Sequence, residues 1–184
     1  MKKVYVLLAN GFEVIEALAP VDIMTRAGIE VVTLSLNDDL EVSSSHNILV
    51  KADRLLSSED YTDGDGIVFP GGYPGYENLL KSEKAMALAK YYLENGKLVG
   101  AICGAPSSLG RKGLLDGRDV TLHFGCYDLL VGKKCNIHDK PVVIDKNLIT
   151  GSGAGYSIDF GLALVNYLAP EKLADVKKAM TIKD

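Results

Sequence analysis

The stretch Lys97–Pro106, KLVGAICGAP, has the pattern of a buried strand followed at once by a sharp turn. Its apolar residues from Leu98 to Ile102 predict a parallel strand, and the Gly-Ala-Pro that follows the cysteine predicts a turn into a helix. Cys103 then lies at the corner, in the geometry of a nucleophile elbow. Backbone N–H groups and a helix N-terminus at that corner favour a thiolate. The alternative is that Cys103 is a small core residue, because free cysteines are often buried.

Strand and helix patterns alternate outward from this stretch. The predicted strands are 4–9, 29–36, 66–69, 98–102 and 120–123, with a hairpin at 141–145 and 147–150; the predicted helices are 13–27, 82–94, one that ends near 112, 156–168 and 170–180. This alternation is typical of a parallel sheet with helices on both faces. We therefore predict an α/β fold, a three-layer sandwich around a mostly parallel sheet, formed by residues 1–184 as a single domain.

Composition narrows the classes of protein that this chain can belong to. It has 184 residues, a net charge of -4 and 47% hydrophobic residues, which is ordinary for a soluble globular domain. Lysine and arginine form no basic face, so we expect no nucleic-acid partner. No apolar stretch approaches the ~20 residues of a membrane helix, and the N-terminal apolar run is too short for a signal peptide. The three cysteines favour a reducing compartment over a disulfide framework, so we expect a cytoplasmic protein.

The turns after three of the strands are expected to meet. Ligands of parallel α/β sheets bind outside the carboxyl ends of the strands. Residues 10–16, residues 70–72 and Cys103 each follow a predicted strand, so a carboxylate, backbone donors and a thiol are brought to one rim. Glu16 is the candidate carboxylate: beside the thiol, the two groups share one proton, which raises the pKa of Glu16 and holds Cys103 as a thiolate.

Two further features of these turns have a structural and a functional interpretation. Glu13 lies three residues before Glu16 on the same helix face, and an acid in a first turn can equally serve the helix dipole. Gly71 and Gly72 let the backbone approach a ligand closely, so their N–H groups can point at a developing oxyanion. Glycine pairs after a strand are also common simply as turns.

Motifs spread over nearly the whole chain resemble one known family. They are GFEVIE at 11–16, FPGG at 69–72, AIC at 101–103 and LITG at 148–151. Together they resemble the ThiJ/PfpI superfamily, whose domain is of the class I glutamine amidotransferase type, and within it the DJ-one branch. The resemblance implies a flavodoxin-like sandwich, usually a homodimer.

The same resemblance implies roles for particular residues. Cys103 would be the reactive cysteine, Glu16 its protonated partner, Gly72 and Gly104 the stabilising amides, and His123 a histidine near the cysteine. The implied activity is conversion of methylglyoxal or glyoxal to a hydroxy acid, a glyoxalase reaction, or removal of such adducts from glycated proteins by a deglycase. No cofactor and no metal are expected for it.

Two other functions use the same residues. A redox sensor or chaperone would oxidise Cys103 to a sulfinate in the response to oxidative stress. A peptidase or amidase of the superfamily would carry a histidine directly after the cysteine, whereas this chain has Gly104. The DJ-one branch normally has Ala-Gly-Pro after the cysteine, so the order Gly104-Ala-Pro is a departure from that pattern as well.

Metal and nucleotide binding are the remaining possibilities. His123, Cys126, Cys135 and His138 have zinc-like spacing, H-x2-C-x8-C-x2-H. The intervening 129–131 resembles a strand, which argues against convergence of the four side chains, and the family resemblance assigns His123 to the active site.

The late loop at 151–156, GSGAGY, matches part of a dinucleotide-binding fingerprint. It lacks the third glycine, and too few residues follow it for a strand with a ribose-binding acid. We therefore expect no nucleotide cofactor. In the same loop, Ser152 and Ala154 stand where the DJ-one branch tends to have Arg and Pro.

Overall fold

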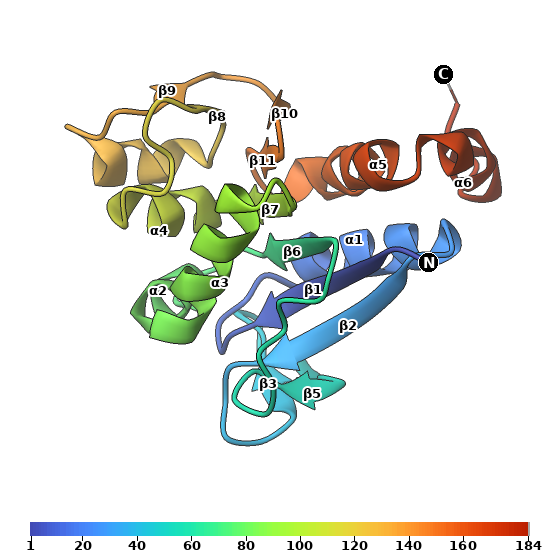
Figure 1. Cartoon of the computed structure of the whole chain (residues 1–184), viewed down its shortest axis with the longest axis horizontal. Coiled ribbons are helices and arrows are strands. Elements are labelled where there is room, and N and C mark those ends of the chain that lie inside the picture. The colour runs from blue at the N-terminus through green and yellow to red at the C-terminus, as the bar shows by residue number, and fades with distance from the viewer. Residues whose placement is uncertain (184) are drawn as a thin grey trace.

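A seven-stranded sheet runs through the middle of the molecule (Figure 1). The computed structural model describes residues 1–183. The strands of this sheet are β1 (Lys3–Leu8), β2 (Glu30–Ser35), β5 (Arg54–Leu55), β6 (Gly66–Phe69), β7 (Leu98–Ile102), β10 (Val142–Asp145) and β11 (Leu148–Gly151). Their order is β10-β11-β7-β6-β1-β2-β5, and every neighbouring pair is parallel except β10 and β11. The predicted α/β fold class and the predicted hairpin are both confirmed.

Helices cover both faces of the sheet (Figure 1). One face carries α1 (Val14–Arg26), α5 (Ser157–Leu168) and α6 (Leu173–Ala179), and the other carries α2 (Gly75–Lys81), α3 (Glu83–Glu94) and α4 (Ala105–Arg111). Alternate residues of β1 divide between the two cores, because successive side chains of a strand point to opposite faces. Val4 and Val6 pack with α1 and α5, whereas Tyr5 and Leu7 pack with α2, α3 and α4.

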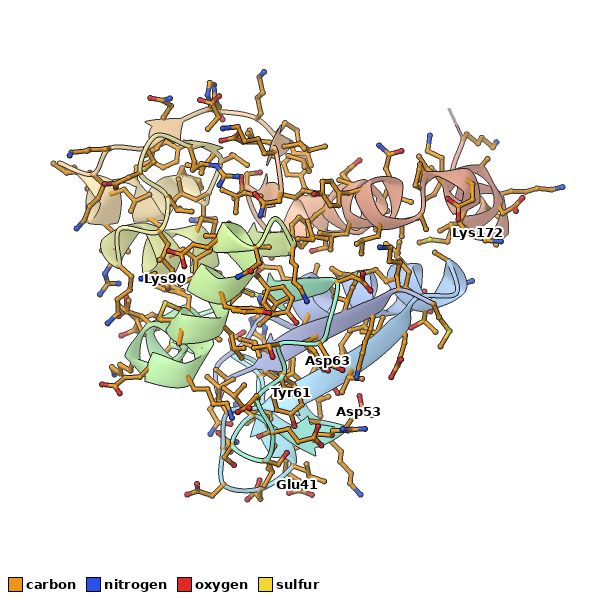
Figure 2. All side chains as sticks on the ribbon, viewed as in Figure 1. Glu41, Asp53, Tyr61, Asp63, Lys90 and Lys172 are labelled. Carbon is orange, nitrogen blue, oxygen red and sulfur yellow. The ribbon has the colours of Figure 1, made fainter. Side chains whose placement is uncertain are left out.

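Short elements complete the chain at its edges. They are the hairpin β3 (Glu41–Ser43) and β4 (Leu49–Lys51), the pair β8 (Asp119–Val120) and β9 (Asn136–Ile137), and the 3-10 helices η1 (Phe124–Leu130), η2 (Ala154–Tyr156) and η3 (Pro170–Lys172). Charged side chains such as Lys90 and Lys172 are exposed at the surface (Figure 2). Within residues 1–183, no helix has both the length and the apolar character needed to span a membrane.

The segment around His123 differs from its prediction. The strand expected at 120–123 is only β8, because the N–H of Thr121 donates to Oγ1 of Thr150 (2.9 Å) instead of continuing a ladder. Nδ1 of His123 then accepts the N–H of Gly125 (3.1 Å) and caps η1. The strand-like interpretation of 129–131 is therefore wrong: Leu130 belongs to η1, where it packs in a small apolar cluster.

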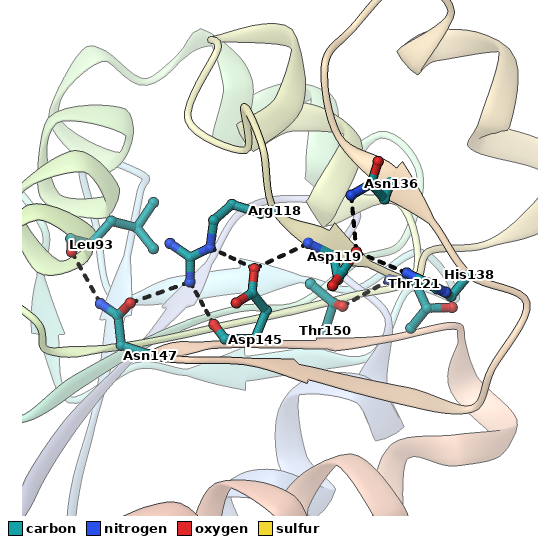
Figure 3. A network of polar contacts seen from close by, with 9 residues as sticks. All are labelled: Leu93, Arg118, Asp119, Thr121, Asn136, His138, Asp145, Asn147 and Thr150. Carbon is teal, nitrogen blue, oxygen red and sulfur yellow. Dashed lines mark hydrogen bonds and ion pairs between the residues drawn. The ribbon is translucent and has the colours of Figure 1, made fainter.

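A polar network fastens this segment to the sheet (Figure 3). Nε of Arg118 lies 2.8 Å from Oδ2 of Asp145, and both side chains are 16% exposed. The same carboxylate accepts the N–H of Asp119 (3.0 Å). Ion pairs this well shielded are screened less than surface pairs. The network and the bond from Thr121 to Thr150 therefore fix the chain just before His123 against the β10–β11 hairpin.

Candidate active site

The turns after β1, β6, β7 and β11 are hydrogen-bonded to one another. The N–H of Glu13 donates to the carbonyl of Gly71 (3.0 Å), and the N–H of Gly71 donates to Oε2 of Glu16 (3.0 Å). Cys103 directly follows β7, and its N–H donates to the carbonyl of Gly151 (2.9 Å). The structure therefore brings the carboxyl group, the glycine turn and the thiol to one rim, and adds the late loop after β11.

The backbone of Cys103 is held in an unusual conformation. Its φ is +62°, in the left-handed region that residues other than glycine rarely adopt. Such a conformation costs of order 1–3 kcal/mol and persists only where the surroundings enforce it. Cys103 stands between β7 and α4, as in a nucleophile elbow, and its half-buried thiol accepts hydrogen bonds from the N–H groups of Gly72 and Gly104.

Glu16 is fully buried in the first turn of α1. Burial raises its pKa to about 7; the nearby charge of Glu13 adds to this, and hydrogen bonding with Cys103 and the N–H of Gly71 opposes it. Oε1 has no well-aligned hydrogen-bond partner within residues 1–183. A buried carboxyl oxygen without a partner is costly for the fold, and a carboxyl group with a near-neutral pKa is suited to proton transfer.

The pKa of the Cys103 thiol is raised, first by burial and then by the carboxylate of Glu16, while the amides of Gly72 and Gly104 lower it. The expectation that the elbow lowers this pKa is wrong, because burial and the neighbouring carboxylate of Glu16 both disfavour a thiolate and outweigh the two amides. Once Glu16 carries the proton, its charge is gone and its O–H can donate to the sulfur. The two groups therefore behave as a pair that holds one proton.

Gly71 allows the carboxyl group to approach. A Cβ at this position would lie 2.6 Å from Oε2 of Glu16 and 2.7 Å from Cβ of Cys103. The expectation that the Gly71 N–H points at an oxyanion is wrong, because this N–H already donates to Glu16. Gly72 (φ +90°) and Gly104 are the residues whose amides reach the thiol.

The ring of Tyr76 explains why position 104 is a glycine, where the DJ-one branch normally has an alanine. A Cβ on Gly104 would lie 2.3 Å from Cδ1 of Tyr76, so the ring fills the space that a larger residue would need. The N–H of Tyr76 also donates to the carbonyl of Gly72 (2.9 Å). Tyr76 thus contacts both glycines whose amides face the thiol. The sequence analysis missed it, because nothing in its local pattern indicates a contact with the elbow.

His123 lies in the same pocket as Cys103 and Glu16, which has a volume of about 520 Å³. Its backbone N–H donates to the carbonyl of Cys103 (3.0 Å), and its ring stacks on Phe124 at 4.4 Å. Since Nδ1 accepts the N–H of Gly125, a neutral His123 carries its proton on Nε2.

The late loop forms another wall of the pocket. Ser152 and Ala154, noted in the sequence as departures, both line it. Three lining residues were not anticipated: Phe124, Tyr127 and Asp139. They lie on irregular segments and 3-10 turns, whose placement no periodic pattern predicts.

The residues with zinc-like spacing do not form a cluster. Among residues 1–183, no group of three or more His, Cys, Asp or Glu side chains is arranged to hold a metal ion. His138 instead pairs with Asp119 (3.0 Å), while Cys126 packs in the apolar cluster with Leu122.

These features define a flavodoxin-like α/β protein with a cysteine at a nucleophile elbow and a buried carboxyl group beside it. The family model described as the DJ-1/PfpI family matches residues 2–167. The chain belongs to this family.

Curated relatives and solved structures agree with this assignment. The Parkinson disease protein 7 homolog of Danio rerio is 34% identical over 187 residues, which cover 100% of this chain and 98% of that protein. Protein DJ-1 homolog B of Arabidopsis thaliana is 35% identical over 182 residues, but this chain spans only 41% of its length. The structure described as "Toxoplasma gondii DJ-1, oxidized" matches with a TM-score of 0.92 at 30% identity and covers 100% of both chains.

The substitution Glu16→Gln is expected to change how stability depends on pH. The pKa of Glu16 is raised from 4.5 to about 7. Between these values the folded protein holds a proton that the unfolded chain has released, so the free energy of unfolding of the wild type falls as the pH rises. Glutamine has no such proton. From about pH 4.5 to about pH 7.5, the variant should therefore gain up to about 3 kcal/mol relative to the wild type.

Urea denaturation at several pH values measures this difference. Asp128→Asn is the control, because it removes an exposed carboxylate outside the pocket. If the difference in the free energy of unfolding between Glu16→Gln and the wild type stays constant with pH, the raised pKa of Glu16 is contradicted.

Proposed function

We propose that this protein is a cofactor-independent cysteine enzyme acting on small 2-oxoaldehydes, such as methylglyoxal and glyoxal, or on their adducts with proteins. The observation that carries this proposal is the pairing of Cys103 with a buried carboxyl group of near-neutral pKa. Such a pair supplies a nucleophile and a proton carrier at one point. Family membership supports it at the level of the DJ-1 type.

The first step would be addition of the Cys103 thiolate to the aldehyde carbon. The carbon–sulfur bond forms as the carbonyl π-electrons move to oxygen, giving a hemithioacetal. The amides of Gly72 and Gly104, which already bond to the sulfur, are the donors available to this oxygen. Glu16 supplies the proton that neutralises it.

The second step would move a proton between the adjacent carbons. Glu16, assisted by His123, removes the hydrogen of the former aldehyde carbon as a proton and returns it to the neighbouring carbonyl carbon through an enediol. The aldehyde carbon is thereby oxidised and its neighbour reduced, leaving a thioester of Cys103. Water then cleaves the thioester to release lactate or glycolate and the free thiol, so no external oxidant is required.

Removing either member of the pair should abolish the reaction. Cys103→Ser is expected to lose at least about 100-fold in kcat with methylglyoxal, since the nucleophile is gone, and Glu16→Gln should lose on the order of 100-fold through the proton transfer. Lactate formation gives the rate. Cys135→Ser, a cysteine outside the pocket, should match the wild type. An unchanged rate in Cys103→Ser or Glu16→Gln would refute the mechanism.

A redox-sensing role is the second candidate, favoured by the similarity to a DJ-1 structure described as oxidized. Two equivalents of peroxide would convert the thiolate to a sulfinate with loss of water. Oε1 of Glu16, which lacks a partner, could then donate its proton to a sulfinate oxygen.

Intact mass after dilute peroxide tests this role. The wild type and Cys135→Ser should each gain two oxygen atoms at Cys103, and Cys103→Ser should not gain them. Selective oxidation of a sample that does not turn over methylglyoxal would assign the protein to sensing rather than catalysis. Equal oxidation of all three cysteines would exclude sensing.

We also propose a cytoplasmic homodimer. Three free cysteines fit a reducing compartment. Exposed apolar side chains lie on segments joined to one another: Ile15 on α1, Leu49 on the β3–β4 hairpin, and Ile158 on α5. The hairpin bonds to Phe12 just before α1, and α5 packs along α1.

Ile158→Asp should shift the sedimentation of the protein from dimer to monomer, since a carboxylate would be buried without a partner. Sedimentation equilibrium at micromolar concentration measures the change. Val131→Asp, at an exposed site outside these segments, is the control. A monomeric wild type would refute the dimer.

A further inference from the structure

The pocket at Cys103 carries negative charge and lacks fixed positive charge. Glu13, Glu16 and Asp139 line it, and no lysine or arginine does among the described residues. Four other surface pockets of the described chain each include at least one lysine. The absence of a cation is therefore a property of this pocket and does not follow from the overall composition.

The carboxylates at the mouth of the pocket are not neutralised within the described chain. Asp139 is exposed and makes no hydrogen bond or ion pair within residues 1–183. The carboxylate of Glu13 accepts the N–H of Glu16 (2.9 Å) but has no cationic partner there. A molecule bound at the mouth would face the carboxylates of Glu13 and Asp139 directly.

Aromatic rings complete the rim. Phe124 is 77% exposed and Tyr156 is 43% exposed, although both line the pocket. Tyr127, which also lines the pocket, is half-buried. Aromatic faces attract cations and accept uncharged apolar groups, but they offer nothing to an anion. His123 is the one lining residue whose side chain can gain positive charge.

We propose that this pocket selects uncharged or positively charged carbonyl compounds and disfavours those that carry a carboxylate or phosphate. The inference rests on the proposed function in one respect, because it takes the pocket to be the place where substrate binds. Its physical basis is the interaction between unit charges several ångströms apart at a protein surface. This interaction changes the local concentration of a charged ligand at the pocket several-fold, and it weakens as salt is added.

Charged thiol reagents of matched size test the selectivity without turnover. We would compare 2-(trimethylammonium)ethyl and 2-sulfonatoethyl methanethiosulfonate, each of which transfers its thioalkyl group to a thiolate and releases methanesulfinate. The rate at Cys103 is followed by mass spectrometry at about pH 8 and divided by the rate with 2-mercaptoethanol. The normalised ratio of cationic to anionic reagent should be about 10 at low salt, and should fall towards 1 at about 0.5 M salt.

Both variants of the rim should lower this ratio, whereas their control should leave it unchanged. Asp139→Asn should lower it about 3-fold, and Ser152→Arg, which places a cation on the late loop, should lower it about 10-fold. Asp128→Asn removes the same charge from the exposed surface outside the pocket and should leave the ratio within about 1.5-fold of the wild type.

A wild-type ratio at or below 1 would overturn the inference, as would a ratio that Asp128→Asn lowers as much as Asp139→Asn does. Because Ser152→Arg adds charge where Asp139→Asn removes it, a folding defect in one variant leaves the other as a test. The reagents report on Cys103 whether or not methylglyoxal is turned over, so failure of the enzyme assay and failure of this inference are separate results.

Discussion

The burial of the Glu16 carboxyl group against the Gly71 amide and the Cys103 thiol is the constraint on which the site depends. This contact joins α1 to the turn after β6 and to the corner after β7. It requires a glycine at position 71, since any Cβ would occupy the place of the carboxyl oxygen. It also sets the protonation of both partners, because each disfavours a charge on the other.

The same contact weakens the fold that holds it. A buried carboxyl oxygen without a partner and a cysteine in the left-handed region both cost free energy. The apolar layers on both faces of the sheet supply the stability that offsets them. The loop with His123 is also held by contacts outside the pocket, which involve Arg118, Asp145 and Thr150. Its position therefore does not depend on the strained backbone of Cys103 alone.

Much of this arrangement was accessible from sequence. The alternation of strands and helices predicts a parallel sheet, and the carboxyl ends of parallel strands share an edge, so Glu16, Gly72 and Cys103 could be expected at one rim. The segment after β8 could not be predicted, because a threonine hydroxyl distant in sequence ends the strand. The rise in the pKa of Cys103 depends on burial, which no local motif encodes. Tyr127 and Asp139 belong to a 3-10 helix and an irregular segment that only tertiary contacts position.

The ring of Tyr76 against Gly104 has a consequence for how this protein could diverge. Relatives of the peptidase type are expected to place a histidine at the position of Gly104, but here any side chain would collide with the tyrosine ring. An ancestor or descendant that exchanged one chemistry for the other would have to lose the bulky ring first. Sterics thus constrain the order of the two replacements, because a side chain at position 104 requires that the ring of Tyr76 move or be replaced.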